Sequence, residues 1–259
     1  MAAVAFGNAV DNYRSTEVMA YRHQVNRVGA SLLDFIFQSP CPLCDRSAAE
    51  LICATCQRQI HAQQYSSRQT FWRSDLPIYP WGRYSGALRQ SLSALKYERQ
   101  PRIAQLLGGW LAQAWLTSAE YASLPRKSRI VVIPIPMYAE KRRQRGYDQA
   151  VLIARQFCTV TRLPLRQRGL IRERATTAQF GLSAKEREAN LSGAFCVSSG
   201  LLHSKVSVLL IDDIYTTGAT ARAAADALRQ AALPVSGLLA VASPQLIGHT
   251  EISTSDVRL

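Results

Sequence analysis

The chain has 259 residues, a hydrophobic content of 47% and a formal net charge of +13. This length allows one large domain, or a medium domain joined to a small one. The basic balance favours anionic partners, either phosphorylated small molecules or nucleic acid. No apolar run reaches the roughly 18 residues of a membrane helix, and the first 22 residues lack the apolar core of a signal peptide. We therefore expect a cytoplasmic protein without membrane insertion.

Two cysteine pairs indicate a small module near the N-terminus. Residues 1–30 show no clear periodicity and are predicted to be a tail, whereas 31–60 form the module, which opens with a short apolar helix over 31–37. The Cys-x-x-Cys pairs are Cys41 with Cys44 and Cys53 with Cys56. Two such turns can offer four thiolates to one ion, which predicts structural zinc. Redox chemistry or two disulfides are the alternatives, but a cytosolic chain disfavours disulfides.

Residues 61–125 are expected to form a connecting region. His61 is a competing zinc ligand, although a surface or helix histidine is the simpler interpretation. The strand expected over 78–84 is rich in aromatic residues. Its aromatic side chains are candidates for stacking single-stranded DNA bases, with core packing as the favoured alternative. They are Tyr79, Trp81 and Tyr84.

Two helices are expected after this strand. Leucines at helical spacing predict the first over 86–97, and a second begins at Pro101 and runs to about residue 115. Lys96, near the end of the first helix, is a candidate anion contact or an ordinary solvated lysine.

A buried strand over 130–133 begins the next region, which we expect to form one domain over 126–259. A basic turn follows it and a helix is predicted over 147–158, so its cations lie between a strand's carboxyl end and a helix start. Arg143 and Arg145 are therefore candidates for binding a second anionic group, and a solvated basic turn is the alternative.

The segment 163–190 has the least regular pattern and many cations. Long polar loops in compact domains are often lids, and a lid here would exclude water from a bound sugar diphosphate. Its binding candidates are Arg174, Gln179 and Arg187.

The central motif runs from residue 208 to 220. Four apolar residues predict a buried parallel strand, and Asp212 and Asp213 follow it. A turn then opens a helix expected over 219–232, and the N–H groups of such a turn suit a phosphate. The carboxylates suit sugar hydroxyls or a hard cation such as Mg²⁺. The phosphate-binding candidates in the turn are Thr216, Thr217, Gly218, Ala219 and Thr220.

This motif predicts a sugar phosphate ligand. A solvated Asp-Asp pair before a glycine turn is the alternative. The full pattern of apolar strand, Asp-Asp and Thr-Thr-Gly-Ala-Thr resembles the phosphoribosyl pyrophosphate motif of type I phosphoribosyltransferases. Another strand is expected over 193–197 and the last one over 236–243, so the order of elements fits a doubly wound α/β domain.

The whole pattern resembles the ComF/GntX family of late-competence proteins over about residues 31–243. The matching pieces are the two cysteine pairs, Leu95-Lys96-Tyr97, Ile133-Pro-Ile-Pro136, Arg143-x-Arg145-Gly146-Tyr147-x-Gln149-Ala150, Arg174-x-Thr176 with Gln179, Arg187-x-x-Asn190, Gly193-Ala-Phe195 and Asp212-Asp213. The family commonly has Asn where this chain has Asp148.

The resemblance implies an α/β fold, with a type I phosphoribosyltransferase-like parallel sheet flanked by helices and a small N-terminal four-cysteine zinc module. It also implies a role in natural transformation, in the uptake and handling of single-stranded DNA. The expected partners are phosphoribosyl pyrophosphate or a similar sugar phosphate, single-stranded DNA, and cytosolic competence proteins such as a translocase and a recombination mediator.

Two hypotheses about function remain open from the sequence. In one, the protein is a DNA-uptake factor whose transferase-like domain binds a phosphoribosyl ligand. In the other it is an active phosphoribosyltransferase of nucleotide metabolism or salvage, acting on a base or amine. Asp212 and Asp213 would then be catalytic, with Mg²⁺ and the two arginines stabilising the leaving diphosphate.

Overall fold

The computed structural model describes residues 39–65, 71–73, 76–123, 129–172, 193–202 and 204–244. Two compact units divide the chain, residues 1–54 and residues 55–259. In the first unit, strands β1 (Ser39–Pro40) and β2 (Ser47–Ala48) pair antiparallel, and the first cysteine pair lies in the turn that joins them. The predicted tail and the apolar helix over 31–37 lie outside the described residues.

The second unit alternates helices and strands. Its helices are α2 (Ala54–His61), α3 (Gly86–Tyr97), α4 (Ile103–Leu116), α5 (Ala119–Ser123), α6 (Ala139–Arg145), α7 (Gln149–Thr161), the 3₁₀ turn η1 (Ser199–Leu201) and α9 (Ala219–Gln230). Its strands are β3 (Phe71–Arg73), β4 (Leu76–Arg83), β5 (Ile130–Pro134), β6 (Leu170–Arg172), β7 (Phe195–Val197), β8 (Ser207–Ile214) and β9 (Val235–Ser243).

A five-stranded sheet in the order β3-β4-β9-β8-β5 forms the centre of this unit. Every pair from β4 to β5 is parallel, and β3 adds an antiparallel edge. The predicted parallel sheet flanked by helices is confirmed. The segment that we expected to connect two modules contributes β4 to this sheet.

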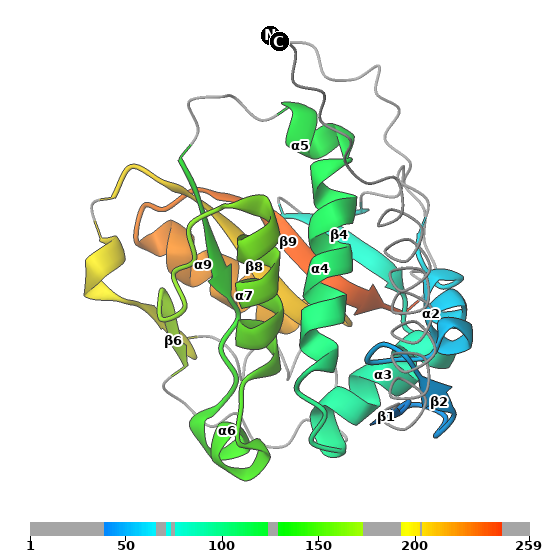
Figure 1. Cartoon of the computed structure of the whole chain (residues 1–259). Coiled ribbons are helices and arrows are strands. Elements are labelled where there is room, and N and C mark those ends of the chain that lie inside the picture. The colour runs from blue at the N-terminus through cyan, green and yellow to red at the C-terminus, as the bar shows by residue number, and fades with distance from the viewer. Residues whose placement is uncertain are drawn as a thin grey trace, which may run out of the picture. The chain divides into compact units, whose positions relative to one another are not determined.

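Helices cover both faces of the sheet, as Figure 1 shows. Helices α4 and α7 pack together on one face, and α9 lies on the other. Successive side chains along β8 point to opposite faces of the sheet, which explains this arrangement. Val208 and Leu210 belong to the core that contains the α9 alanines, whereas Leu209 and Ile211 are buried outside that core. Among the described residues, none of the helices has the length and apolar character that crossing a membrane requires.

Several boundaries differ from the sequence prediction by a few residues. Strand β8 extends to Ile214, so Asp212 and Asp213 lie within the strand instead of following it, because Asp212 and Ile214 keep their register with β9. The predicted basic turn contains a short helix, α6, which ends at Gly146 in a left-handed conformation. Helix α4 begins at Ile103, two residues after the predicted start.

Candidate functional site

A cavity of about 400 Å³ opens at the carboxyl ends of β5 and β8. It contains residues that the sequence analysis selected from four separate segments. These are Lys96 from α3, Arg145 from α6, Asp212 and Asp213 from β8, and Thr216 and Thr220 from the turn and α9. Four cationic and two acidic side chains line this cavity, because Lys141 and Arg172 also reach it. The surplus of positive charge suits an anionic ligand.

The turn between β8 and α9 has the geometry that the motif predicted. Gly218 adopts the left-handed region, with φ +78°, and caps the N-terminus of α9. A side chain at Gly218 has no room, because its Cβ would lie 2.5 Å from the Tyr215 hydroxyl and 2.9 Å from Arg222 Nη1. Arg222 also donates a hydrogen bond of 3.1 Å to the Thr217 carbonyl. The turn is therefore held in shape, and the first N–H groups of α9 have no partner within the helix.

Lys96 and Asp213 form an ion pair within the cavity. Lys96 Nζ lies 2.8 Å from Asp213 Oδ2, and the two side chains are 16% and 7% exposed. The sequence analysis considered Lys96 only as an anion contact or a solvated residue. In the structure, Lys96 instead pairs with Asp213, which is one of the two carboxylates predicted to bind the ligand.

The other carboxylate, Asp212, faces a different environment. Its Oδ1 accepts a hydrogen bond of 2.8 Å from the Asp213 backbone N–H. Burial and the neighbouring Asp213 carboxylate raise the pKa of Asp212 well above its usual value of 3.8, and Lys96 opposes this shift. Asp212, Asp213 and Lys96 together therefore form a group of side chains with a low net charge.

The two predicted arginines of the basic segment lie differently. Arg145 lines the cavity, donates a hydrogen bond to Gln149 Oε1, and stacks on Tyr97 with its Cζ 5.7 Å from the ring centroid. Arg143 forms an ion pair with Glu140 on the exposed side of α6 and is not among the described residues that line the cavity. Lys141 reaches the cavity from the same helix.

Arg172 was not selected from the sequence but lines the cavity from β6. Its guanidinium lies over the Phe195 ring, 5.5 Å from the centroid. Burial lowers the pKa of Arg172, and the carboxylate of Asp212 opposes that shift. The only local signal was its position among many cations in the irregular segment, which does not distinguish it from its neighbours.

The side chains of Asp148 and Tyr147 hold segments that line the cavity. Asp148 caps α7 and accepts hydrogen bonds from Val151 N at 3.3 Å and from Met137 N at 3.0 Å. Burial raises the pKa of Asp148. The Tyr147 hydroxyl donates to the Leu95 carbonyl, which ties the end of α3 to the start of α7. These contacts place Met137 and Lys96 at the cavity.

The aromatic residues of the strand predicted over 78–84 divide between core and cavity. Trp81 is 4% exposed and stacks with Trp110 at 5.8 Å, and Tyr79 meets Trp115 edge-on at 5.4 Å. Their geometry is that of core packing, the alternative favoured from the sequence. Tyr84 instead lines the cavity.

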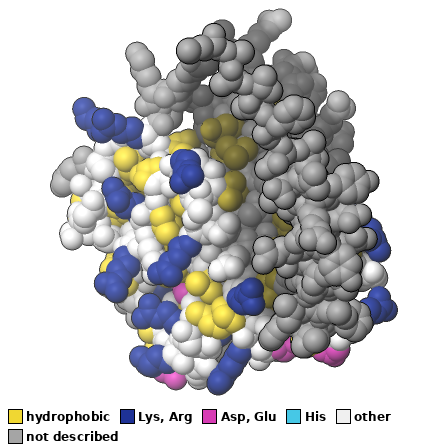
Figure 2. All heavy atoms as spheres, in the orientation of Figure 1, with side chains coloured by type: hydrophobic (Ala, Val, Ile, Leu, Met, Phe, Trp, Pro, Cys, Tyr) yellow, Lys and Arg dark blue, Asp and Glu magenta, His cyan; other side chains and the backbone are white. Residues whose placement is uncertain are grey.

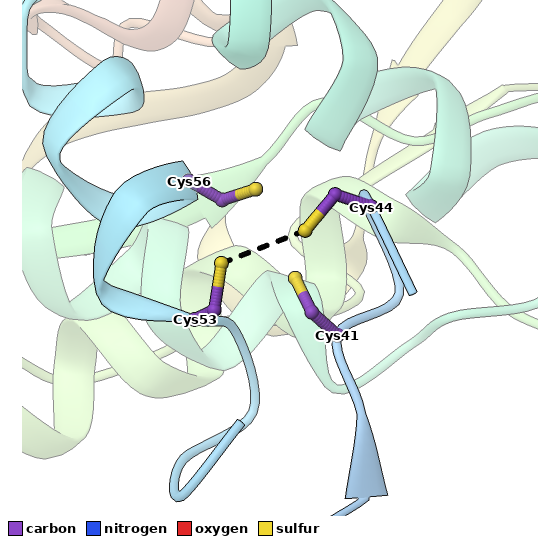
Figure 3. Close-up of side chains that lie close together, drawn as sticks. All are labelled: Cys41, Cys44, Cys53 and Cys56. Atoms are coloured by element: carbon purple, nitrogen blue, oxygen red, sulfur yellow. Dashed lines mark hydrogen bonds between the residues drawn. The ribbon is translucent and has the colours of Figure 1, made fainter. Parts of the chain in front are cut away.

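Four cysteine side chains converge in a second cluster (Figure 3). Their sulfur atoms all lie within 4.8 Å of one another, and Cys44 and Cys53 sulfurs are 3.5 Å apart. Backbone hydrogen bonds from Cys44 N and Asp45 N to the Cys41 carbonyl tighten the first turn. Four convergent thiols fit a tetrahedral metal ion. His61 packs on Trp110 with ring centroids 4.6 Å apart and is not part of the described cluster.

Several selected residues lie outside the described part of the chain. They are the loop candidates Arg174, Gln179 and Arg187. Their assignment stays a prediction.

Comparison with known proteins gives consistent names at low identity. No protein-family model matches the sequence. The chain is 28% identical over 202 residues to competence protein F of Haemophilus influenzae, which covers 69% of this chain and 84% of that protein. It is 27% identical over 185 residues to the DNA utilization protein YhgH of Salmonella typhi, covering 65% and 80%. Competence protein ComFC of Bacillus subtilis is 25% identical over 190 residues, covering 73% and 70%.

Two solved structures align with part of this chain. Adenine phosphoribosyltransferase of Leishmania donovani aligns with a TM-score of 0.37 at 15% identity, covering 68% of this chain and 75% of that one. The glutamine phosphoribosylpyrophosphate amidotransferase of B. subtilis, complexed with ADP and GMP, aligns with a TM-score of 0.35 at 19% identity, over 58% of this chain and 30% of that longer one. The curated matches confirm the predicted resemblance: this chain is similar to competence protein F, to ComFC and to YhgH.

Proposed function

We propose that this protein binds phosphoribosyl pyrophosphate, or a similar sugar phosphate, in the cavity at the carboxyl ends of β5 and β8, and that it serves DNA utilization in competence. The observation that carries the proposal is the meeting of Lys96, Asp212, Asp213 and the Thr216–Thr220 turn around one cavity of about 400 Å³.

The turn before α9 supplies the phosphate end of this site. Helix N-termini present N–H groups and a positive dipole end to anions. The hydroxyls of Thr216 and Thr220 line the same cavity and can donate to phosphate oxygens. Arg145 and Lys141 of α6 add positive charge to the same cavity, and we assign the diphosphate group to them.

The carboxylates supply the sugar end. Oxygen atoms of Asp212 and Asp213 can accept hydrogen bonds from ribose hydroxyls. Lys96 holds Asp213 at 2.8 Å and lowers the repulsion that two carboxylates would exert on a phosphorylated ligand. A diphosphate ligand would bring Mg²⁺, which binds carboxylate and phosphate oxygens and needs only one or two protein carboxylates. Asp212, which lines the cavity, would be that carboxylate.

The cysteine cluster is proposed to hold zinc for structure. Four thiolates complete a tetrahedral shell, and structural zinc sites contribute directly to folding energy. A full shell leaves no open position for catalysis at the metal.

The DNA role is supported by what the relatives are called. Three curated relatives are described as competence or DNA utilization proteins. The net charge of +13 is consistent with nucleic acid as a partner. We place the protein in the cytoplasm, beside a translocase and a recombination mediator that handle single-stranded DNA.

Transfer of the phosphoribosyl group is the second candidate function. The ion pair of Asp213 with Lys96 favours it, because charged side chains that are largely withdrawn from solvent stabilise developing charge strongly. Such an activity would show as release of diphosphate with any base or amine as acceptor.

Titration calorimetry with phosphoribosyl pyrophosphate and Mg²⁺ tests the binding proposal. We expect saturable binding by the wild type and a loss of at least about tenfold in the D212N/D213N variant. The matched control is D226N, which changes an exposed aspartate of α9 whose partner is Arg229. Equal affinity in both variants would refute the site. Transformation frequency measured with the same variants links the ligand to DNA uptake, and a normal frequency in D212N/D213N would separate the two.

A further inference from the structure

An exposed tyrosine at the cavity has no structural explanation in its packing. Tyr97 is 74% exposed, the highest exposure among the large hydrophobic side chains of the described residues, and it is one of the residues that line the cavity. It is the last residue of α3 and follows Lys96 directly. Aromatic rings usually bury their faces, so a ring left open beside a polar cavity is suited to a planar ligand.

The ring is supported by a cation. Arg145 lies with its Cζ 5.7 Å from the Tyr97 ring centroid and also lines the cavity. Its stacking orients the ring, and its charge remains available to a phosphate. An aromatic face beside an arginine is the arrangement with which proteins bind single-stranded nucleic acid.

The aromatic ring and the phosphate turn belong to the same cavity. Lys96, the neighbour of Tyr97, pairs with Asp213, which precedes the Thr216 turn by three residues. A phosphate cradle and an aromatic residue therefore line one cavity of about 400 Å³, a volume typical of small-ligand sites.

Positive charge continues beyond the cavity. Arg142 and Arg143 are exposed on α6, next to the cavity-lining Lys141 and Arg145, and Arg99 is exposed two residues after Tyr97. Figure 2 shows Lys and Arg side chains gathered on the surface where α6 lies in Figure 1. A single nucleotide needs none of these outer cations, whereas a strand with further phosphates would use them.

We propose that the cavity receives the 5′-phosphorylated end of a single DNA strand. The terminal phosphate binds the Thr216–Thr220 turn, the first base stacks on Tyr97, and the following phosphates lie along the cations of α6. The inference rests on the phosphate cradle of the proposed function. An end is favoured over an internal position because a phosphate monoester carries up to about two negative charges, against one for a diester.

Fluorescence anisotropy with the full chain tests this proposal. The probes are short oligothymidylates labelled at the 3′ end, with a 5′-phosphate or a 5′-hydroxyl. We expect the 5′-phosphorylated strand to bind about tenfold more tightly, with an affinity that falls as salt rises. Equal binding of the two probes would overturn the proposal.

Variants of Tyr97 separate the contribution of the ring from that of the hydroxyl. Y97A should lower the affinity for the 5′-phosphorylated strand by about tenfold, while Y97F keeps it, because stacking needs the ring and not the hydroxyl. Y121A, which removes another exposed tyrosine on α5, is the matched control and should change nothing. Unchanged binding by Y97A, with a normal melting temperature, would refute the role of Tyr97.

Competition distinguishes this inference from the function proposed above. Phosphoribosyl pyrophosphate should displace the 5′-phosphorylated strand, and free thymidine 5′-monophosphate should displace it far less well than an unlabelled strand. Equal potency of the mononucleotide would show that only a nucleotide is recognised and would overturn the proposal. If phosphoribosyl pyrophosphate binds while no probe prefers a 5′-phosphate, this inference fails and the sugar phosphate site stands.

Discussion

Lys96 and Asp213 lie 2.8 Å apart, although they are distant in the sequence and belong to α3 and β8. Both side chains are largely withdrawn from solvent. The pair joins α3, which follows β4, to the end of β8. In the sheet, β8 lies two places from β4. The pair thereby places the exposed Tyr97 beside the carboxylates.

Removal of Lys96 should lower the free energy of unfolding. K96M leaves Asp213 as a buried carboxylate without its partner, so we expect a loss of about 3 kcal/mol in the free energy of unfolding. Urea denaturation measures it, with K205M at an exposed lysine as the control. The double variant K96M/D213N should recover much of the loss. A stability equal to that of K205M would contradict the role of the pair.

Stability should depend on pH through Asp212. Its pKa is raised in the folded protein by burial and by Asp213, so above pH 3.8 the unfolded chain releases this proton before the folded chain does. The wild type therefore loses stability relative to D212N as pH rises from 3.8 through the raised pKa, and the difference then levels off.

Thermal unfolding of wild type and D212N between pH 4 and about 8 measures this difference. The Asn side chain keeps an oxygen to accept the bond from the Asp213 N–H. D226N, at an exposed aspartate, should follow the wild type across the range. A constant difference between D212N and wild type would show that Asp212 titrates normally.

The phosphate turn should be intolerant of a side chain at Gly218. G146A and G218A both place alanine in a left-handed conformation, with φ +87° and φ +78°, which costs about 1 kcal/mol. Only G218A also drives a Cβ against the Tyr215 hydroxyl, because nothing lies within 4 Å at Gly146.

G218A should therefore lose more stability than G146A in urea denaturation, and it should bind phosphoribosyl pyrophosphate more weakly. If the two variants are equally stable, the close contact with Tyr215 does not hold the turn.

The cysteine cluster should bind a single zinc ion. C44S removes one of four thiolates and should lower the zinc content, measured by plasma mass spectrometry, and the melting temperature. C158S is the control, because burial raises the pKa of the Cys158 thiol to about 12 and keeps it protonated. Wild-type protein without zinc, or full zinc in C44S, would exclude the assignment.

Local patterns determined much of this protein. The spacing of Cys41, Cys44, Cys53 and Cys56 predicted a cluster, because short turns bring neighbouring thiols together whatever the rest of the fold does. The apolar run before Asp212 and the glycine turn after it predicted the strand, the turn and α9, because periodicity and backbone conformation act over a few residues.

Only the tertiary structure decided which of these segments meet. Strand order in the sheet places the ends of β5 and β8 side by side, and the packing of α3 brings Lys96 to Asp213 and leaves Tyr97 open. Arg145 turns inward while Arg143 turns to Glu140, although both belong to one basic run. Such choices depend on contacts between residues far apart in the chain, and a charge or an aromatic ring in sequence carries no information on its distant neighbours.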